Sequence, residues 1–131
     1  MKTLLIVDDN PIIQSFIKYR YGKTYLVISF SDGLEAFHAI RNLKVIPDLV
    51  LADLDMPGMT GFEFTEAIKR SGILKQIPVI ILSGKQKSDD RIKAYLSGAE
   101  MYLQKPFNPQ ELDVVIFKTI QKNHKNLIQN Q

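Results

Sequence analysis

Short apolar runs alternate with amphipathic stretches five times along the chain. We interpret each run as a β-strand, and the runs are Leu4–Val7, Tyr25–Ile28, Leu49–Ala52, Val79–Leu82 and Met101–Leu103. The third and fourth runs are apolar at every position, which is typical of parallel strands covered on both faces.

The amphipathic stretches carry the signals of helix starts. A hydrogen-bond acceptor at the N-cap, followed by proline or an acidic residue, occurs at Asn10-Pro11, Asp32 with Glu35, Thr60 with Glu63, Ser88 with Asp89 and Asp90, and Asn108-Pro109. We expect the helix from Ser88 to bury Ile92, Tyr95 and Ala99. The last helix should bury Leu112, Val115, Ile116 and Ile120. Five strand–helix units predict an α/β fold with a doubly wound parallel sheet and right-handed crossovers.

A chain of 131 residues, with 45% hydrophobic and 24% charged residues, has the size and composition of one globular domain. It contains no cysteine, which excludes a disulfide scaffold, a zinc finger and a thiol nucleophile. The apolar run after Met1 is too short for a signal peptide, and no later run is long enough to span a membrane. We therefore expect a cytoplasmic protein.

The net charge of +3 comes entirely from residues 84–131, because residues 1–83 hold nine basic and nine acidic side chains. The basic residues are scattered singly, so the sequence does not predict nucleic-acid binding. We expect residues 1–123 to form the domain and residues 124–131 to be a polar C-terminal tail or the start of a linker. Met1 lies so close to the first strand that it suggests a natural start.

Candidate functional residues stand at the carboxyl ends of four expected strands. They are Asp8 and Asp9, Asp53 and Asp55, Ser83 and Gly84, and Lys105 and Pro106. In open α/β sheets the functional crevice lies at these ends. Adjacent parallel strands are ~5 Å apart, so the aspartates converge if the first and third strands are neighbours.

Carboxylates at such a separation repel one another by about 3 kcal/mol per pair at an effective dielectric constant of ~20. A set of oxygen donors without His or Cys favours Mg²⁺ as the balancing cation. With a metal present, one carboxylate can act as a nucleophile and form an acyl phosphate. The Ser83 hydroxyl and the Lys105 ammonium could then contact phosphoryl oxygens.

Each of these residues also has a structural interpretation when taken alone. Asp8 and Asp9 could be a helix N-cap pair, and Asp53 could serve the turn before Pro57-Gly58. Ser83 could be a turn residue and Lys105 an exposed lysine. Their joint occurrence at strand ends favours the functional interpretation.

The combination resembles the receiver domain of bacterial two-component response regulators. The motifs that carry the resemblance are Asp8-Asp9, the run from Leu51 to Gly61 with its Asp53-Leu54-Asp55-Met56-Pro57 core, Leu82-Ser83-Gly84, and Lys105-Pro106-Phe107. The resemblance covers roughly residues 2 to 122. It implies a flavodoxin-like (βα)5 fold with strand order 2-1-3-4-5, and a signalling switch that catalyses only its own phosphorylation and dephosphorylation.

The resemblance also implies roles for the acidic residues. Asp53 would accept a phosphoryl group from the phosphohistidine of a histidine kinase. Asp9 would bind Mg²⁺, or Mn²⁺, directly, Asp8 largely through water, and Asp55 through its backbone carbonyl. Asp55 and Lys85 stand at two variable positions of the family, where the pair could shield the phosphoryl group from water.

Three further residues would carry the switch. Ser83 would be the switch hydroxyl and Lys105 the phosphoryl partner, and the bond to Pro106 would be cis. Tyr102 matches an aromatic residue whose rotamer reports phosphorylation, and we expect it to swing into space vacated beside the fifth strand.

The implied partners are a sensor histidine kinase or a phosphotransfer protein, and then a downstream partner or a second copy. The contact with the downstream partner or second copy would use residues 88–120. The positive charges in or next to this stretch are Lys87, Arg91, Lys93, Lys118 and Lys122. No contact with nucleic acid or membrane is expected.

Three alternatives remain open at this point. A haloacid-dehalogenase-type phosphatase also uses an Asp-x-Asp motif, but places it after the first strand and usually has a longer chain. A flavodoxin-like module would hold a flavin phosphate, which Asp8 and Asp9 would repel. A degenerate receiver would act only as a scaffold, whereas here the set of residues is intact.

Overall fold

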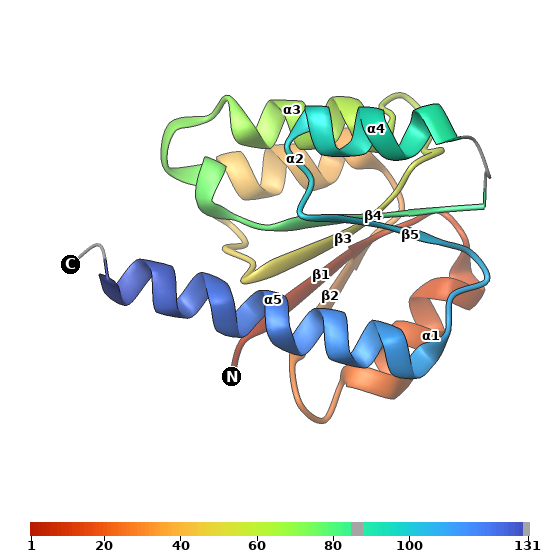
Figure 1. Cartoon of the computed structure of the whole chain (residues 1–131), viewed down its shortest axis with the longest axis horizontal. Coiled ribbons are helices and arrows are strands. Elements are labelled where there is room, and N and C mark those ends of the chain that lie inside the picture. The colour runs from red at the N-terminus through yellow and green to blue at the C-terminus, as the bar shows by residue number, and fades with distance from the viewer. Residues whose placement is uncertain (85–87, 130–131) are drawn as a thin grey trace.

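The computed structural model describes residues 1–84 and 88–129, and Figure 1 shows the arrangement of their elements. The elements are β1 (Thr3–Val7), α1 (Pro11–Tyr21), β2 (Leu26–Phe30), α2 (Gly33–Arg41), β3 (Leu49–Asp53), α3 (Gly61–Lys69), the 3₁₀ helix η1 (Gly72–Gln76), β4 (Val79–Ser83), α4 (Ser88–Ser97), β5 (Met101–Gln104) and α5 (Pro109–Gln129).

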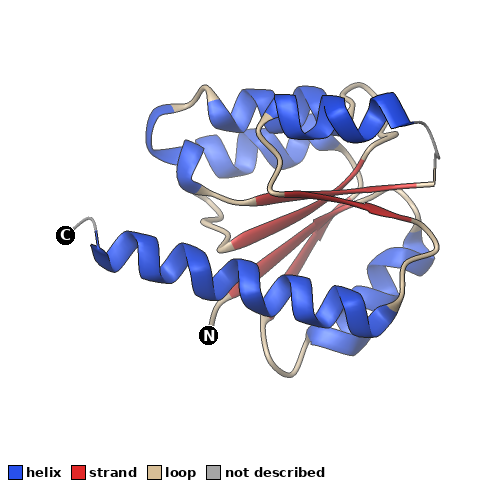
Figure 2. Cartoon of the chain, viewed as in Figure 1, coloured by secondary structure: helices blue, strands red, loops and turns tan. Residues whose placement is uncertain are grey.

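The five strands form one sheet in the order β2-β1-β3-β4-β5, and every neighbouring pair is parallel. Helices α2, α3 and α4 cover one face of the sheet, and α1 and α5 cover the other, so the red strands of Figure 2 lie between two blue layers. The predicted doubly wound sheet and its strand order are confirmed.

A separate apolar core lies on each face of the sheet. Because side chains alternate along a strand, Leu5 and Val7 pack toward α2–α4, whereas Leu4 and Ile6 pack toward α1 and α5. All residues of β3 and β4 are buried, as their uniformly apolar runs predict. Two packed faces hold the carboxyl ends of the central strands in fixed positions.

The predicted helix starts are observed, and side-chain caps account for those of α1, α2, α3 and α5. Asn10 accepts a hydrogen bond from the Ile12 amide at 2.9 Å. Thr60 and Glu63 form a reciprocal capping box. The last helix buries Leu112, Ile116 and Ile120, whereas Val115, which we also expected to be buried, is only half-buried. The helix continues to Gln129, so residues 124–129 extend it.

The prediction of which face of α4 is buried is wrong. Ile92 and Tyr95 are 58% and 47% exposed. The helix instead turns Asp90, Ala94 and Ser97 inward, which are spaced four and three residues apart. Small side chains let α4 approach the sheet, and the larger apolar ones remain on its outer surface. Ala99 is buried, but it lies after the helix ends.

The bounds of the second strand differ from the prediction. The strand is Leu26–Phe30 and not the expected Tyr25–Ile28, so it begins one residue later and extends two residues further.

None of the described helices is both long enough and apolar enough to cross a membrane.

Candidate functional site

The strand register brings the predicted acidic residues together at the carboxyl edge of the sheet, on the right in Figure 1. Val7 of β1 pairs with Ala52 of β3, so Asp8 and Asp53 follow side by side. One carboxylate oxygen each from Asp8, Asp9 and Asp53 lie within 4.8 Å of one another. Asp55 is exposed, and its carboxylate is not part of this cluster.

Asp8 is fully buried and held from several sides. Its Oδ1 accepts a hydrogen bond from the Asn10 amide at 2.9 Å, and its own amide donates to the Phe30 carbonyl at 3.0 Å. Gln14 Nε2 donates to the Asp8 carbonyl at 2.5 Å and to Ser31 Oγ at 3.1 Å. The first strand end is thereby tied to the second, and the position of the Asp8 carboxylate is fixed.

Lys105 joins the two central carboxylates. Its Nζ lies 2.7 Å from Asp8 Oδ2 and 3.1 Å from Asp53 Oδ1. Its amide donates to the Ser83 carbonyl at 2.6 Å, and the Lys105–Pro106 peptide bond is cis. The lysine therefore reaches the acidic pocket from the far side of β4.

The electrostatics of this pocket follow from burial and charge. Burial raises the pKa of Asp53, the neighbouring Asp8 carboxylate adds to the rise, and the Lys105 ammonium opposes it. Burial alone would lower the pKa of Lys105. Hydrogen bonding to Asp8 and attraction to Asp53 outweigh that effect and raise the pKa above the ordinary lysine value.

The loop after Asp53 returns closely over the end of β3. A Cβ atom on Gly61 would lie 2.8 Å from the Asp53 carbonyl oxygen, so only glycine allows this approach. The Gly61 amide donates to the Leu54 carbonyl at 2.8 Å. The start of α3 thus fixes the backbone that carries Asp53.

Ser83 and Tyr102 are both buried next to this pocket. Ser83 ends β4, one residue beyond the Asp53–Leu82 pair of the register, and it is 0% exposed. Tyr102 lies on β5 and is 3% exposed, with the Arg91 guanidinium 5.5 Å from its ring centre. The ring that we expected to swing inward is therefore already buried. Lys85 and Lys87 lie outside the described residues. The expectation that Lys85 and Asp55 together shield the phosphoryl group therefore stays a prediction.

Sequence reasoning missed Gln14 altogether, and it considered Arg91 only as a positive charge of residues 88–120 and not as a contact of Tyr102. Gln14 follows the N-cap Asn10 by four residues, and this spacing places it on the same side of α1 as the strand ends. Arg91 carries no comparable signal, because its contact with Tyr102 depends on how α4 packs.

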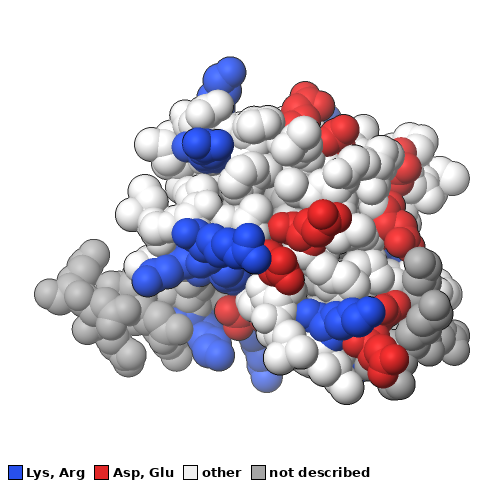
Figure 3. All heavy atoms as spheres, turned by 90° about the horizontal axis from the view of Figure 1, so that it is seen from above, with Lys and Arg blue, Asp and Glu red and all other residues white. Residues whose placement is uncertain are grey.

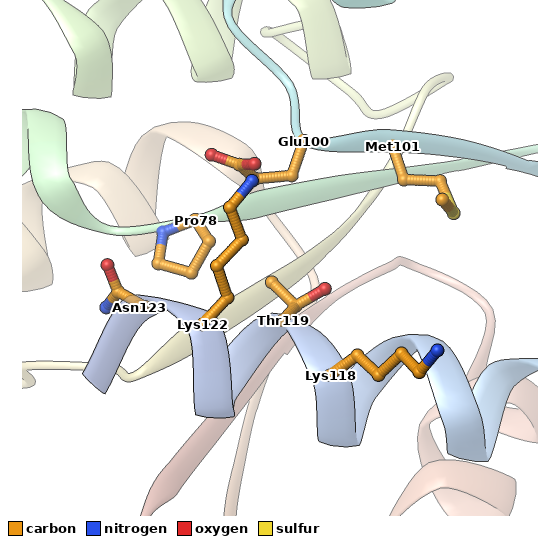
Figure 4. A pocket seen from close by; sticks show the side chains of 7 residues that line it. All are labelled: Pro78, Glu100, Met101, Lys118, Thr119, Lys122 and Asn123. Carbon is orange, nitrogen blue, oxygen red and sulfur yellow. The ribbon is translucent and has the colours of Figure 1, made fainter. Parts of the chain in front are cut away.

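A cavity of about 260 Å³ lies at the opposite edge of the sheet, between α5 and the start of β5 (Figure 4). It is lined by Pro78, Glu100, Met101, Lys118, Thr119, Lys122 and Asn123, and the Lys122 side chain extends from α5 toward Glu100. One carboxylate beside two lysines does not form a cation site. The chemistry of the donors therefore identifies the carboxyl edge as the functional site.

Comparison with known proteins agrees with this geometry. A model of the response regulator receiver domain matches residues 4–117. The chain belongs to this family. The haloacid-dehalogenase alternative is not supported.

The relatives include full regulators and solved receivers. The chain is 36% identical over 112 residues to the phosphate regulon transcriptional regulatory protein PhoB of Pseudomonas aeruginosa, which covers 85% of this chain and 48% of that protein. The chain spans between 7% and 58% of the length of this and several other curated relatives.

Solved receivers share the fold over nearly their whole length. The chemotaxis protein CheY4 of Vibrio cholerae has a TM-score of 0.80 and 30% identity, covering 91% of this chain and 98% of that one. The receiver of sensor histidine kinase PA1611 from Pseudomonas aeruginosa has a TM-score of 0.81 and 27% identity, covering 92% and 98%. That structure has a magnesium ion coordinated in its active-site cleft. Receiver domains bind Mg²⁺ in such an acidic pocket, and here the pocket is the cluster of Asp8, Asp9 and Asp53.

Proposed function

We propose that this receiver domain is a cytoplasmic phosphorelay switch, in which Asp53 accepts a phosphoryl group from the phosphohistidine of a sensor histidine kinase or a phosphotransfer protein. The observation that carries the proposal is the position of Lys105 Nζ, which contacts Asp8 and Asp53 in a pocket of three converging carboxylates. This arrangement suits the binding of one further cation and one phosphoryl group.

Asp53 is the best placed nucleophile of the three aspartates. Both Asp8 oxygens are engaged, by the Asn10 amide and by Lys105, and Asp9 is exposed. Asp53 is 8% exposed and contacts Lys105 through Oδ1, so Oδ2 has no hydrogen-bond donor among the described residues. A bond from this oxygen to phosphorus would form as the phosphorus–nitrogen bond of the donor breaks, and its electron pair returns to the imidazole.

The donor set fits a divalent cation. Asp8, Asp9 and Asp53 supply only oxygen, which suits Mg²⁺ and also Mn²⁺, and the Asp55 backbone carbonyl would complete the set. When bound, the cation neutralises the carboxylates and the incoming phosphoryl oxygens. Lys105 and the Ser83 hydroxyl would then hold the phosphoryl oxygens on Asp53, and Lys105 stays charged because its pKa is raised.

An apolar hollow of about 230 Å³ adjoins the site and fits the donor protein. It is lined by Ile12, Ile13, Phe16, Lys105, Pro106, Phe107 and Pro109. Ile12 is 75% exposed and lies in this apolar hollow with Ile13 and Phe16, so the three side chains together offer an apolar surface to a partner. A donor seated between α1 and the loop before α5 would present its phosphohistidine to Asp53.

Residues 88–120 would form the surface that contacts a downstream partner or a second copy. This stretch exposes large apolar side chains at Ile92, Tyr95, Leu96, Val114 and Phe117. Nearby Arg91, Lys93 and Lys118 make an acidic partner surface the better match. The expected activity is limited to the domain's own phosphorylation and dephosphorylation.

The proposal is tested by intact mass after incubation with a small acyl phosphate. The parent should gain one phosphoryl group with Mg²⁺ or Mn²⁺ and none with a chelator, because the carboxylates otherwise repel the phosphate. Asp53→Asn should abolish the gain. Asp89→Asn removes an exposed carboxylate outside the pocket and should behave like the parent. Full phosphorylation of Asp53→Asn would overturn the assignment.

A further inference from the structure

Tyr102 is buried although it carries a hydroxyl group and lies at the end of the sheet where the functional site is. It is 3% exposed and belongs to the apolar core between the sheet and helices α2–α4. Arg91, from α4, lies over its ring. The guanidinium carbon is 5.5 Å from the ring centre, which is within the range of a cation–π contact.

The position of Arg91 follows from the inverted packing of α4. Asp90 and Ala94 face the sheet, so Arg91 emerges at the edge of that face, beside β5. No carboxylate of residues 1–84 and 88–123 lies within ion-pair distance of its guanidinium. A planar guanidinium stacks on an aromatic face in a way that an ammonium reproduces only in part.

The space around the contact would allow both the Arg91 guanidinium and the Tyr102 ring to take other positions. A cavity of about 480 Å³ adjoins the ring, and its lining includes Arg91, Tyr95, Tyr102, Phe107 and Glu111. Glu111 of α5 faces this cavity and offers Arg91 a carboxylate as an alternative partner. The structure shows Arg91 on the ring, and the cavity leaves room for a second arrangement in which Arg91 turns away and the ring moves outward.

We propose that Arg91 is a positioning residue that keeps the Tyr102 ring in its buried place before any phosphoryl group is bound. The proposal rests on the proposed function and on the role that the family resemblance implies for Tyr102, which is to report the state of Asp53 to the face formed by α4, β5 and α5. Arg91 then sets the fraction of molecules in which the Tyr102 ring is buried when no phosphoryl group is bound. Phosphorylation raises this fraction further, but the buried position already exists without it.

Nitration of tyrosines by tetranitromethane, read by peptide mass spectrometry, tests this directly. Without Arg91 the ring should be exposed more often, so nitration of Tyr102 should rise about two- to fivefold in Arg91→Gln, as expected for a cation–π contact near the surface. Lys93→Gln is the matched control, since it removes the same charge from an exposed position on the same helix. Arg91→Lys should restore protection in part.

Two other tyrosines serve as internal standards. Tyr19 is 91% exposed and should react in every variant, and Tyr21 is 6% exposed and should stay protected. Equal nitration of Tyr102 in Arg91→Gln and Lys93→Gln would overturn the proposal. A parallel rise at Tyr21 would also overturn it, because the effect would then be a general loss of packing.

Repeating the comparison with beryllofluoride and Mg²⁺ separates this inference from the proposed function. Beryllofluoride imitates a phosphoryl group on Asp53, so it should return Tyr102 of Arg91→Gln toward the protection of the parent. If beryllofluoride changes nothing in any variant, the switch role of Tyr102 fails. The comparison of Arg91→Gln with Lys93→Gln in its absence still decides the role of Arg91.

Discussion

At the scale of single residues, Lys105 occupies the place where a cation is needed. Its ammonium contacts the carboxylates of Asp8 and Asp53 at 2.7 and 3.1 Å, and all three side chains are largely buried. The lysine therefore stabilises the pocket without a metal, and it also competes with a metal for the same oxygens. A phosphoryl group would relieve that competition by giving Lys105 a new partner.

Lys105→Met keeps an unbranched side chain of similar length, one atom shorter, and removes its charge. Without a metal the variant should lose about 1–3 kcal/mol of unfolding free energy, because two buried carboxylates lose their charged donor. Added Mg²⁺ should stabilise the variant more than it stabilises the parent. Urea unfolding of both proteins with and without Mg²⁺ measures the two effects. Equal stabilisation of both by Mg²⁺ would contradict the competition.

Gly61 tests how closely the backbone must approach the site. In Gly61→Ala the new Cβ would lie 2.8 Å from the Asp53 carbonyl oxygen and 3.0 Å from the Leu54 Cα, so the end of β3 must shift. We expect a loss of about 1–3 kcal/mol in thermal or urea unfolding, as for other overpacked sites. Gly84→Ala is the control, because its Cβ would meet nothing within 4 Å. Equal stability of the two variants would show that the loop adapts freely.

At the scale of elements, α1 and α5 are joined through the carboxylate of Asp113. Arg20 binds Asp113 through Nε at 2.8 Å and a terminal nitrogen at 2.6 Å, and the Tyr21 hydroxyl donates to the same carboxylate at 2.6 Å. Helix α1 and the start of α5, together with the loop before α5, line the apolar hollow beside Lys105. The contact therefore holds together the two helices that border the surface that we assign to the donor.

The hydrogen bond from Arg20 lowers the pKa of Asp113. Its folded pKa is thus below its unfolded value, so its stabilising effect is full above about pH 4 and is lost as the pH falls through the folded pKa. The difference in unfolding free energy between the parent and Asp113→Asn should shrink in acid. Tyr21→Phe keeps the Arg20 contact and should retain most of the pH dependence. A difference that is constant from neutral pH to acid would contradict this.

How far the elements could be predicted depends on which signal places them. The runs of β3 and β4 are apolar throughout, and the caps at Asn10 and Thr60 are local, so sequence alone located them. The inner face of α4 is set by distance to its neighbours, and there Ala94 and Ser97 fit where Ile92 does not. The acidic residues could be assigned to one edge because strand ends converge, whereas the Arg91–Tyr102 contact requires the packed structure.

At the scale of the whole molecule, charge is unevenly distributed. Figure 3 shows the face of α2, α3 and α4, where acidic side chains gather mostly toward the end that holds the acidic pocket and basic ones toward the other end. A net charge of +3 thus coexists with a strongly acidic site. Recognition of the cation and of an acidic output partner can use different ends of one small domain.

Signal transfer from the acidic pocket to residues 88–120 predicts a directional change in hydrogen exchange. With beryllofluoride and Mg²⁺, amides of α4 and β5 should change protection, because Ser83 and Tyr102, which we expect to act as switch residues, lie on β4 and β5. Amides of β2, which is the edge strand opposite β5, and of α2, which follows β2, should change little. Changes confined to the loops around Asp53 would show that this face is not the output.

The central claim is that Asp53 forms an acyl phosphate, and trapping that bond tests it most directly. Borohydride reduces an aspartyl phosphate to homoserine, which peptide mass spectrometry locates at a single residue. After incubation with a small acyl phosphate and Mg²⁺, the account predicts homoserine at position 53 and unmodified aspartate at positions 8, 9 and 55. Homoserine at one of those three positions, with Asp53 intact, would contradict it.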